Sequence, residues 1–250
     1  MKDYFVLYEK YINSIDAFKK DLLNHYFNNL FNEAMQFGYI GEAEADVIWL
    51  RHILDSLLPL QNSKVNNLFL QAKKCIDLGT GAGLPGIVLA ILFPHCQFQL
   101  IDSSEKRVRF LEKIKSELNL FNLVTLCNQI DSVVLPENEK ADLVTYRAFR
   151  KPLASLELAL YAVRKNGKVL YWRSNQFEYS YVNNSIVELF DVTNRIKQLG
   201  YQVNDFIKLD CPEELVNRGL YIFHYHGNND KVFPRKWPRI IKDKLVERIL

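Results

Sequence analysis

Apolar residues recur at helical spacing near the start of the chain. Between residues 16 and 36 they stand three or four positions apart, as on the buried face of an amphipathic helix. Gly38 and Gly41 interrupt this pattern, and a second helix is expected from about 42 to 58, before Pro59. The pattern therefore predicts a helical extension over residues 1–65.

From Lys73 onward, short apolar runs alternate with segments of helical spacing. The strands predicted in this way lie near 73–78, 97–101, 122–126, 141–145 and 167–172. The helices predicted between and after them lie near 84–93, 104–119, 150–164 and 182–198. This alternation is typical of a parallel sheet with helices on both faces.

Two further strand-like runs, 201–209 and 220–225, have no helix between them. We expect them to form an antiparallel hairpin at one edge of the sheet, which then has seven strands. The prediction is an α/β domain over residues 66–229, followed by a C-terminal tail over 230–250.

Composition narrows the class of protein. The chain has 250 residues, of which 48% are hydrophobic and 24% are charged, as in ordinary globular proteins. The longest purely apolar run, Ile87 to Phe93, is too short to span a bilayer. With no signal-peptide core and four widely spaced cysteines, a cytoplasmic protein without membrane contact or disulfides is expected.

Positive charge is concentrated at the end of the chain. The last twenty residues hold seven Lys or Arg and two acidic residues, a net charge of +5, whereas the whole chain carries +3. The tail is either a solvated helix or an arm that contacts phosphates. In the second case Arg235, Lys236 and Arg239 are candidate RNA-binding residues, and Trp237 is a candidate platform for a stacked base.

The most informative segment runs from Cys75 to Gly86. An apolar strand ends at Asp77, and a turn containing Gly79, Gly81 and Gly83 leads into a helix. Glycines let the backbone turn sharply and let a ligand lie against it. Asp102 follows the second strand, where a carboxylate can accept hydrogen bonds from both hydroxyls of a ribose. The segment therefore predicts a nucleoside cofactor.

Two cofactors fit this loop. Gly81 to Gly86 satisfies the dinucleotide pattern G-x-G-x-x-G, which would indicate an oxidoreductase. S-adenosylmethionine is the other, and three features favour it. Asp77 can face its positively charged methionine portion, Pro85 occupies the helical turn where a pyrophosphate needs free N–H groups, and a terminal hairpin is typical of methyltransferase sheets.

The segment Asp77–Ile87 resembles the motif of the ribosomal RNA small-subunit methyltransferase G family (RsmG, also called GidB). The further segments that resemble this family are Arg51–Leu57, Asp102–Ser103, Lys106–Leu111, Arg147–Phe149 and Phe233–Lys236. The resemblance implies a Rossmann-like class I methyltransferase fold. It also implies transfer of a methyl group from S-adenosyl-L-methionine to N7 of a guanosine in the 530 loop of 16S ribosomal RNA.

The resemblance assigns individual residues. It implies that Gly79 and Leu84 contact the cofactor, that Ile130 and Asp131 border the adenine, and that Arg147 lies at the mouth shared by cofactor and substrate. Together with the residues of the glycine loop and its neighbouring strands, this gives one candidate catalytic residue, Arg147. The candidate cofactor-binding residues are Asp77, Gly79, Gly81, Gly83, Leu84, Asp102, Ile130, Asp131 and Arg147. Arg173 stands where the family has a lysine and is a further RNA-binding candidate.

Methylation at N7 makes few chemical demands. The N7 lone pair can attack a methyl sulfonium without losing a proton, so alignment and exclusion of water are needed instead of a general base. His224 and His226 share one strand face, but no third ligand stands nearby, and no metal is expected. We expect a monomer that binds 16S RNA or the small-subunit particle; a methyltransferase with another substrate and a non-catalytic ribosome-binding protein remain alternatives.

Overall fold

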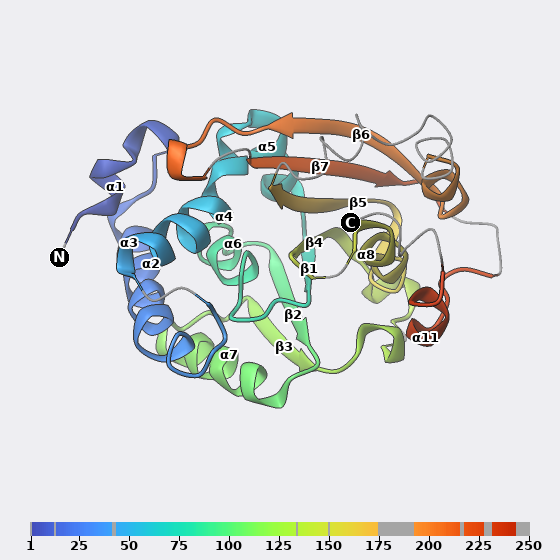
Figure 1. Cartoon of the computed structure of the whole chain (residues 1–250), viewed down its shortest axis with the longest axis horizontal. Helices are drawn as coiled ribbons and strands as arrows, with labels where there is room; N and C mark the ends of the chain where they lie inside the picture. Colours follow the sequence, from blue (N-terminus) through green and yellow to red (C-terminus); the bar gives the residue numbers. More distant parts are fainter. Residues whose placement is uncertain are drawn as a thin grey trace.

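A seven-stranded sheet forms the centre of the computed structural model (Figure 1), which describes residues 2–12, 14–41, 44–133, 135–149, 151–174, 193–215, 218–227 and 232–243. The strand order is β3-β2-β1-β4-β5-β7-β6. The strands are β1 (Lys74–Leu78), β2 (Gln97–Asp102), β3 (Leu123–Cys127), β4 (Ala141–Arg147), β5 (Val163–Ser174), β6 (Tyr201–Lys208) and β7 (Arg218–Tyr225). Strands β1 to β5 pair in parallel, and β7 pairs antiparallel with both β5 and β6. The predicted fold class and terminal hairpin are confirmed.

Helices precede the sheet in the chain. They are α1 (Tyr4–Leu7), α2 (Ala17–Asn29), α3 (Ala45–Ile48), α4 (Asp55–Leu57) and α5 (Ser63–Gln71), with π-helical turns at Leu30–Ala34 and Trp49–Leu54. Side chains fix where they begin: Asp16 accepts a hydrogen bond from the Lys19 N–H at 2.9 Å at the start of α2. Pro59 lies in a 3-10 turn, Leu58–Gln61, which ends the second predicted helix.

The remaining helices are α6 (Gly86–Leu92), α7 (Glu105–Glu117), α8 (Pro152–Ala159) and α11 (Trp237–Ile240). Helix α8 is shorter than the predicted 150–164, because Ala141 N–H donates to Ala162 O at 2.8 Å and the chain joins the sheet at Val163. Of the predicted helix 182–198, residues 193–198 are helical and 182–192 lie outside the described residues.

The two faces of the sheet bury different cores. Alternate strand residues point to opposite faces, so Cys75 packs with the N-terminal helices, α6 and α7, whereas Ile76 and Leu78 pack with α8. The N-terminal helices thus share one core with the sheet. The division at residues 65 and 229 stays a prediction.

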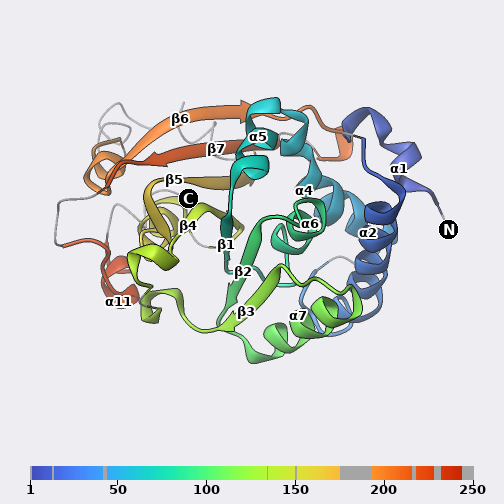
Figure 2. The ribbon, with the colours of Figure 1, turned by 180° about the vertical axis from the view of Figure 1, so that it is seen from behind.

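The described part of the tail, residues 232–243, packs far from the N-terminal helix α1. Figure 1 shows α11 on the same side of the molecule as α8, and both Figures 1 and 2 show it on the opposite side from α1. Ile240 of this short helix is fully buried in the core that α8 covers. In the described part of the chain, none of the helices is both long and apolar enough to cross a membrane.

Candidate functional site

The loop between β1 and α6 is tied to the neighbouring strand. Gly79 N–H and Thr80 N–H both donate to Ile101 O, at 2.8 and 3.2 Å. Gly79 has φ +61°, and a Cβ there would lie 1.9 Å from the Phe149 ring. Gly81 has φ +62°, yet among the described residues a Cβ there would meet no heavy atom within 4 Å. Gly79 is thus closely packed, whereas Gly81 borders open space.

Asp77 organises this loop from beneath. Its side chain is completely buried at the end of β1. One carboxylate oxygen accepts from Thr80 Oγ1 at 2.6 Å and from Gly86 N–H at 3.1 Å, and the other accepts from Thr145 Oγ1 at 2.7 Å. Burial raises the pKa of Asp77 to about 6. Its expected contact with a cofactor stays a prediction, whereas its hydrogen bonds join β1, the loop, α6 and β4.

Asp102 connects the end of β2 to the same loop. Its Oδ2 accepts from Gly81 N–H at 3.0 Å, and its Oδ1 accepts from Ser104 N–H at 2.9 Å. Arg107 Nη1 lies 3.5 Å from Oδ2, so a half-exposed guanidinium partly neutralises the carboxylate. Asp102 therefore shapes the loop and also borders the space beside it.

A pocket of about 280 Å³ opens beside these residues. Its described lining is Gly79, Ile101, Asp102, Ser103, Arg107, Asn128, Gln129, Ile130, Asp131, Ala148, Phe149, Leu158 and Trp237. Four predicted cofactor-binding residues therefore meet there: Gly79, Asp102, Ile130 and Asp131. A carboxylate, apolar walls and an aromatic side chain around one hollow suit a nucleoside.

The other cofactor candidates lie outside the described lining of this pocket. Gly83 and Leu84 are buried, and a Cβ at Gly83 would lie 2.4 Å from Ile87 and 2.9 Å from Leu111. Gly83 is thus needed to pack the loop against α6 and α7. Contacts of these residues with a cofactor stay predictions.

Arg147 reaches from the end of β4 into the N-terminal helices. Its Nη1 donates to Asp55 Oδ2 at 3.0 Å and to Arg51 O at 3.2 Å, and its Nη2 lies 3.4 Å from His52 Nδ1. Arg218 Nε lies 2.9 Å from the other Asp55 oxygen. Two arginines from different strands thus share one buried carboxylate, and the Arg147 guanidinium is held in a fixed orientation.

Sequence reasoning did not find Tyr26. Its buried hydroxyl donates to Ala82 O at 2.9 Å, which connects α2 to the glycine loop. The only signal was a tyrosine among the apolar positions of a predicted helix. Thr145, at the end of β4, was likewise missed, although a hydroxyl beside a buried strand end can pair with a buried acid.

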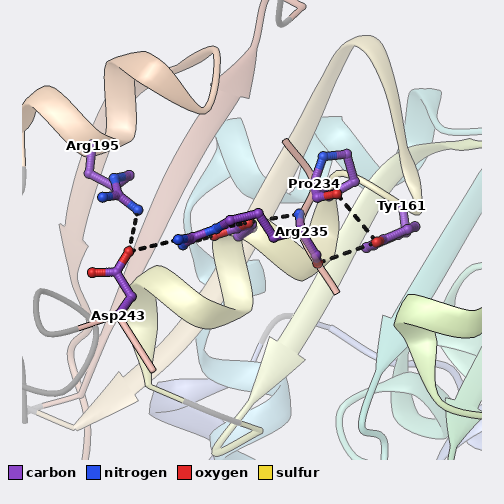
Figure 3. Close-up of polar contacts among 6 residues, drawn as sticks. Tyr161, Arg195, Pro234, Arg235 and Asp243 are labelled. Atoms are coloured by element: carbon purple, nitrogen blue, oxygen red, sulfur yellow. Dashed lines mark hydrogen bonds and ion pairs between the residues drawn. The ribbon is translucent and has the colours of Figure 1, made fainter. Parts of the chain in front are cut away.

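The described tail is anchored by Arg235 (Figure 3). Its Nε and Nη2 donate to the two oxygens of Glu157 at 2.8 and 2.6 Å, and its Nη1 donates to Asp243 at 2.9 Å. Arg195 also binds Asp243, at 2.7 Å, and Tyr161 Oη donates to Arg235 O at 3.3 Å. Contact of Arg235 with RNA stays a prediction; its guanidinium serves as the countercharge of Glu157, which is only 1% exposed.

The other RNA candidates lie in different environments. Lys236 Nζ donates to Asp131 O, and Trp237 lines the pocket described above. Arg239 is exposed, and the side chain of Arg173 lies outside the described residues. Within the described tail, the positive charge of Arg235 is therefore offset by Glu157 and Asp243.

His224 lies in β7, and His226 follows the end of this strand. The rings of His224 and His226 lie 4.1 Å apart, and His226 Nε2 lies 3.1 Å from Gln202 Oε1. Within the ranges that the structure describes, no group of three or more His, Cys, Asp or Glu side chains is placed to hold a metal ion.

Solved structures resemble the fold at low identity. A mutant of MtNAS in complex with S-adenosylmethionine has a TM-score of 0.52 and 12% identity, covering 83% of this chain and 73% of that one. The apo form of the S-adenosylmethionine-dependent methyltransferase SibL has a TM-score of 0.53 and 14% identity, covering 84% and 70%. These likenesses support the fold alone.

Sequence relatives are more specific. The family model described as rRNA small subunit methyltransferase G matches residues 19–202. Two proteins named Ribosomal RNA small subunit methyltransferase G are similar over most of their length: that of Mycoplasma capricolum is 30% identical over 90% of both chains, and that of Mesoplasma florum is 28% identical over 90% of this chain and 89% of its own. The chain therefore belongs to the rRNA small subunit methyltransferase G family.

Proposed function

We propose that the protein transfers a methyl group from S-adenosyl-L-methionine to N7 of a guanosine in the 530 loop of 16S ribosomal RNA. The observation that carries this proposal is the pocket in which Gly79, Asp102, Ile130 and Asp131 meet, in a chain that belongs to this family. We further infer that it acts as a monomer, in the cytoplasm, on RNA or on the small-subunit particle.

The residues fit an adenosyl cofactor. The carboxylate of Asp102 can accept hydrogen bonds from the ribose hydroxyls, and we assign Ile130 and Asp131, which line the same pocket, to the adenine. The open space at Gly81 leaves room for the rest of the molecule against the loop. When bound, the cofactor supplies a methyl group on a positively charged sulfur.

A dinucleotide fits less well. Its pyrophosphate would need the free N–H groups at the start of α6. Pro85 has no N–H, and the Gly86 N–H already donates to buried Asp77. This hydrogen bond favours the methyl donor over the oxidoreductase alternative.

The protein's part in the reaction is alignment. Guanine N7 attacks as a neutral lone pair, so no side chain has to take a proton. Arg147 is oriented by Asp55 and Arg51 O beside the N-terminal helices, and we assign it to the guanosine edge or the neighbouring phosphate. A contact of Arg147 with either of these groups takes no part in proton transfer, and N7 has to stay free to attack the methyl group.

The test combines binding and product analysis. The purified protein is incubated with labelled S-adenosylmethionine and small-subunit particles from cells that lack it, and the methylated nucleoside is identified by mass spectrometry. We expect 7-methylguanosine in the 530 loop. Label at another atom, or NAD binding tighter than S-adenosylmethionine, would contradict the proposal.

A further inference from the structure

The described tail, residues 232–243, borders the cofactor pocket. We propose that Trp237 is a cofactor-binding residue whose indole stacks on the adenine of an adenosyl ligand, and that the tail forms the outer wall of this pocket. The inference rests on the proposed function for the identity of the ligand. It concerns a segment beyond residue 202, where the match to the family model ends.

Asp131 connects the tail to the pocket. The backbone N–H of Trp237 donates to Asp131 Oδ2 at 2.9 Å, and Lys236 Nζ donates to the backbone carbonyl oxygen of Asp131. Trp237 and Asp131 both line the pocket, as does Ile130. The backbone at the indole is therefore fixed by the residue that borders the adenine side.

The described tail is anchored by its contacts with the rest of the chain. Arg235 pairs with buried Glu157, and its guanidinium lies 5.2 Å from the centre of the Phe233 ring (Figure 3 shows the pairing of Arg235 with Asp243). Ile240, at the end of α11, is fully buried. Because these contacts already hold the chain on both sides of Trp237, little conformational freedom is lost when a ligand meets the indole.

The pocket favours a cofactor base over an RNA base as the partner of this indole. Trp237 lines the same hollow as Asp102 and Gly79, which belong to the ends of β2 and β1. A base of RNA on this part of the indole would have to occupy the adenosyl pocket itself. The stacking of Trp237 on RNA, expected from its basic neighbours, becomes the rival outcome of the test.

Calorimetry with the full chain tests the inference. Dissociation constants for S-adenosylhomocysteine and for adenosine are measured with the parent, Trp237→Ala, Trp237→Phe and Lys242→Gln. Loss of base–aromatic stacking weakens binding by between about five-fold and about 150-fold, and we expect this for Trp237→Ala with both ligands. Trp237→Phe keeps a ring and most of the affinity, and Lys242→Gln, which removes an exposed cation of the tail, binds like the parent.

The outcomes separate the two proposals. If the parent binds neither ligand, the proposed function fails. If the parent binds both and Trp237→Ala binds them equally well, the inference alone is wrong. If Trp237→Ala binds both ligands normally but binds 16S RNA more weakly than the parent, the indole contacts RNA, and the inference is wrong.

A measurement on the unchanged protein covers the case in which Trp237→Ala does not fold. Trp49 and Trp172 are buried, so Trp237 is the tryptophan that a ligand in this pocket can touch. S-adenosylhomocysteine should quench the tryptophan emission of the parent, and the same addition to Trp237→Phe should not. Emission of the parent that is unaffected at saturating ligand contradicts the inference.

Discussion

Asp77 allows a sharp test of how the glycine loop is held. Replacing it with Asn keeps its size and removes its charge. The amide oxygen can accept from Thr80 and Gly86, as one carboxylate oxygen does now, and the amide N–H can donate to the Thr145 hydroxyl. Asp77→Asn should therefore fold with the same loop.

The two proteins should differ in how stability depends on pH. Burial raises the pKa of Asp77 from 3.8 to about 6 in the folded protein, so between these values the folded state binds more protons than the unfolded state. Stability then falls as pH rises through this window. At 1.36 kcal/mol per pKa unit, the charged carboxylate costs the fold about 3 kcal/mol at pH values well above 6 compared with values well below 3.8.

Urea unfolding of both proteins from pH 4 to 7.5 measures this difference. Other carboxylates titrate in the same range, but they do so in both proteins, so the difference in unfolding free energy reports Asp77. The advantage of Asp77→Asn over the parent should grow by about 2 kcal/mol from pH 4 to 7, because the titration is already under way at pH 4. An advantage that stays constant, or that shrinks as pH rises, would refute the argument that burial dominates over the three donors.

Three further variants test the loop and the tail. Gly81→Val should fold, and its φ of +62° should lower the unfolding free energy by about 1–2 kcal/mol. In calorimetry it should lose S-adenosylhomocysteine binding, because the side chain enters the open space at the loop; normal binding would show that the ligand does not use this space. Gly79→Ala should also lose S-adenosylhomocysteine binding, since its Cβ would collide with the Phe149 ring. Adding Phe149→Ala should restore part of the affinity, and a double variant that binds no better would contradict this steric explanation. Arg235→Gln should lower the unfolding free energy by about 3–5 kcal/mol and weaken ligand binding, because Glu157 loses its countercharge. Urea unfolding and calorimetry that match those of Lys242→Gln would contradict the anchoring role.

The sheet was accessible to sequence reasoning because its strands repeat a simple pattern. Apolar runs separated by helical spacing gave β1 to β5, and two runs without a helix gave β6 and β7. The end of α8 was placed wrongly, since Leu160 to Ala162 continue an apolar helical pattern while hydrogen bonding to Ala141 draws the chain into the sheet. The spacing of apolar residues along one segment cannot indicate a hydrogen bond to a residue far away in the sequence.

The site was accessible only in part, for a similar reason. Gly79 and Asp102 could be placed together because the ends of neighbouring parallel strands meet at one edge. Tyr26 binds a carbonyl 56 positions away, and Trp237 binds Asp131 across 106 positions. Residue type and spacing indicated a basic tail, but the acid that neutralises Arg235 lies on α8, and only the folded chain brings the two together.

The contacts of the loop show why its sequence alone does not make a pocket. Ala82 O is fixed by Tyr26 from the N-terminal helices, and Gly81 N–H is fixed by Asp102 from β2. Gly79 packs against Phe149, from the segment after β4. Each of these partners comes from a different part of the chain, so the loop reaches its shape only when the N-terminal helices and the sheet have formed one core. A version of the protein without residues 1–65 should therefore lose the pocket together with the helices, because the bond from Tyr26 and the countercharge that Asp55 gives Arg147 both lie in the deleted part.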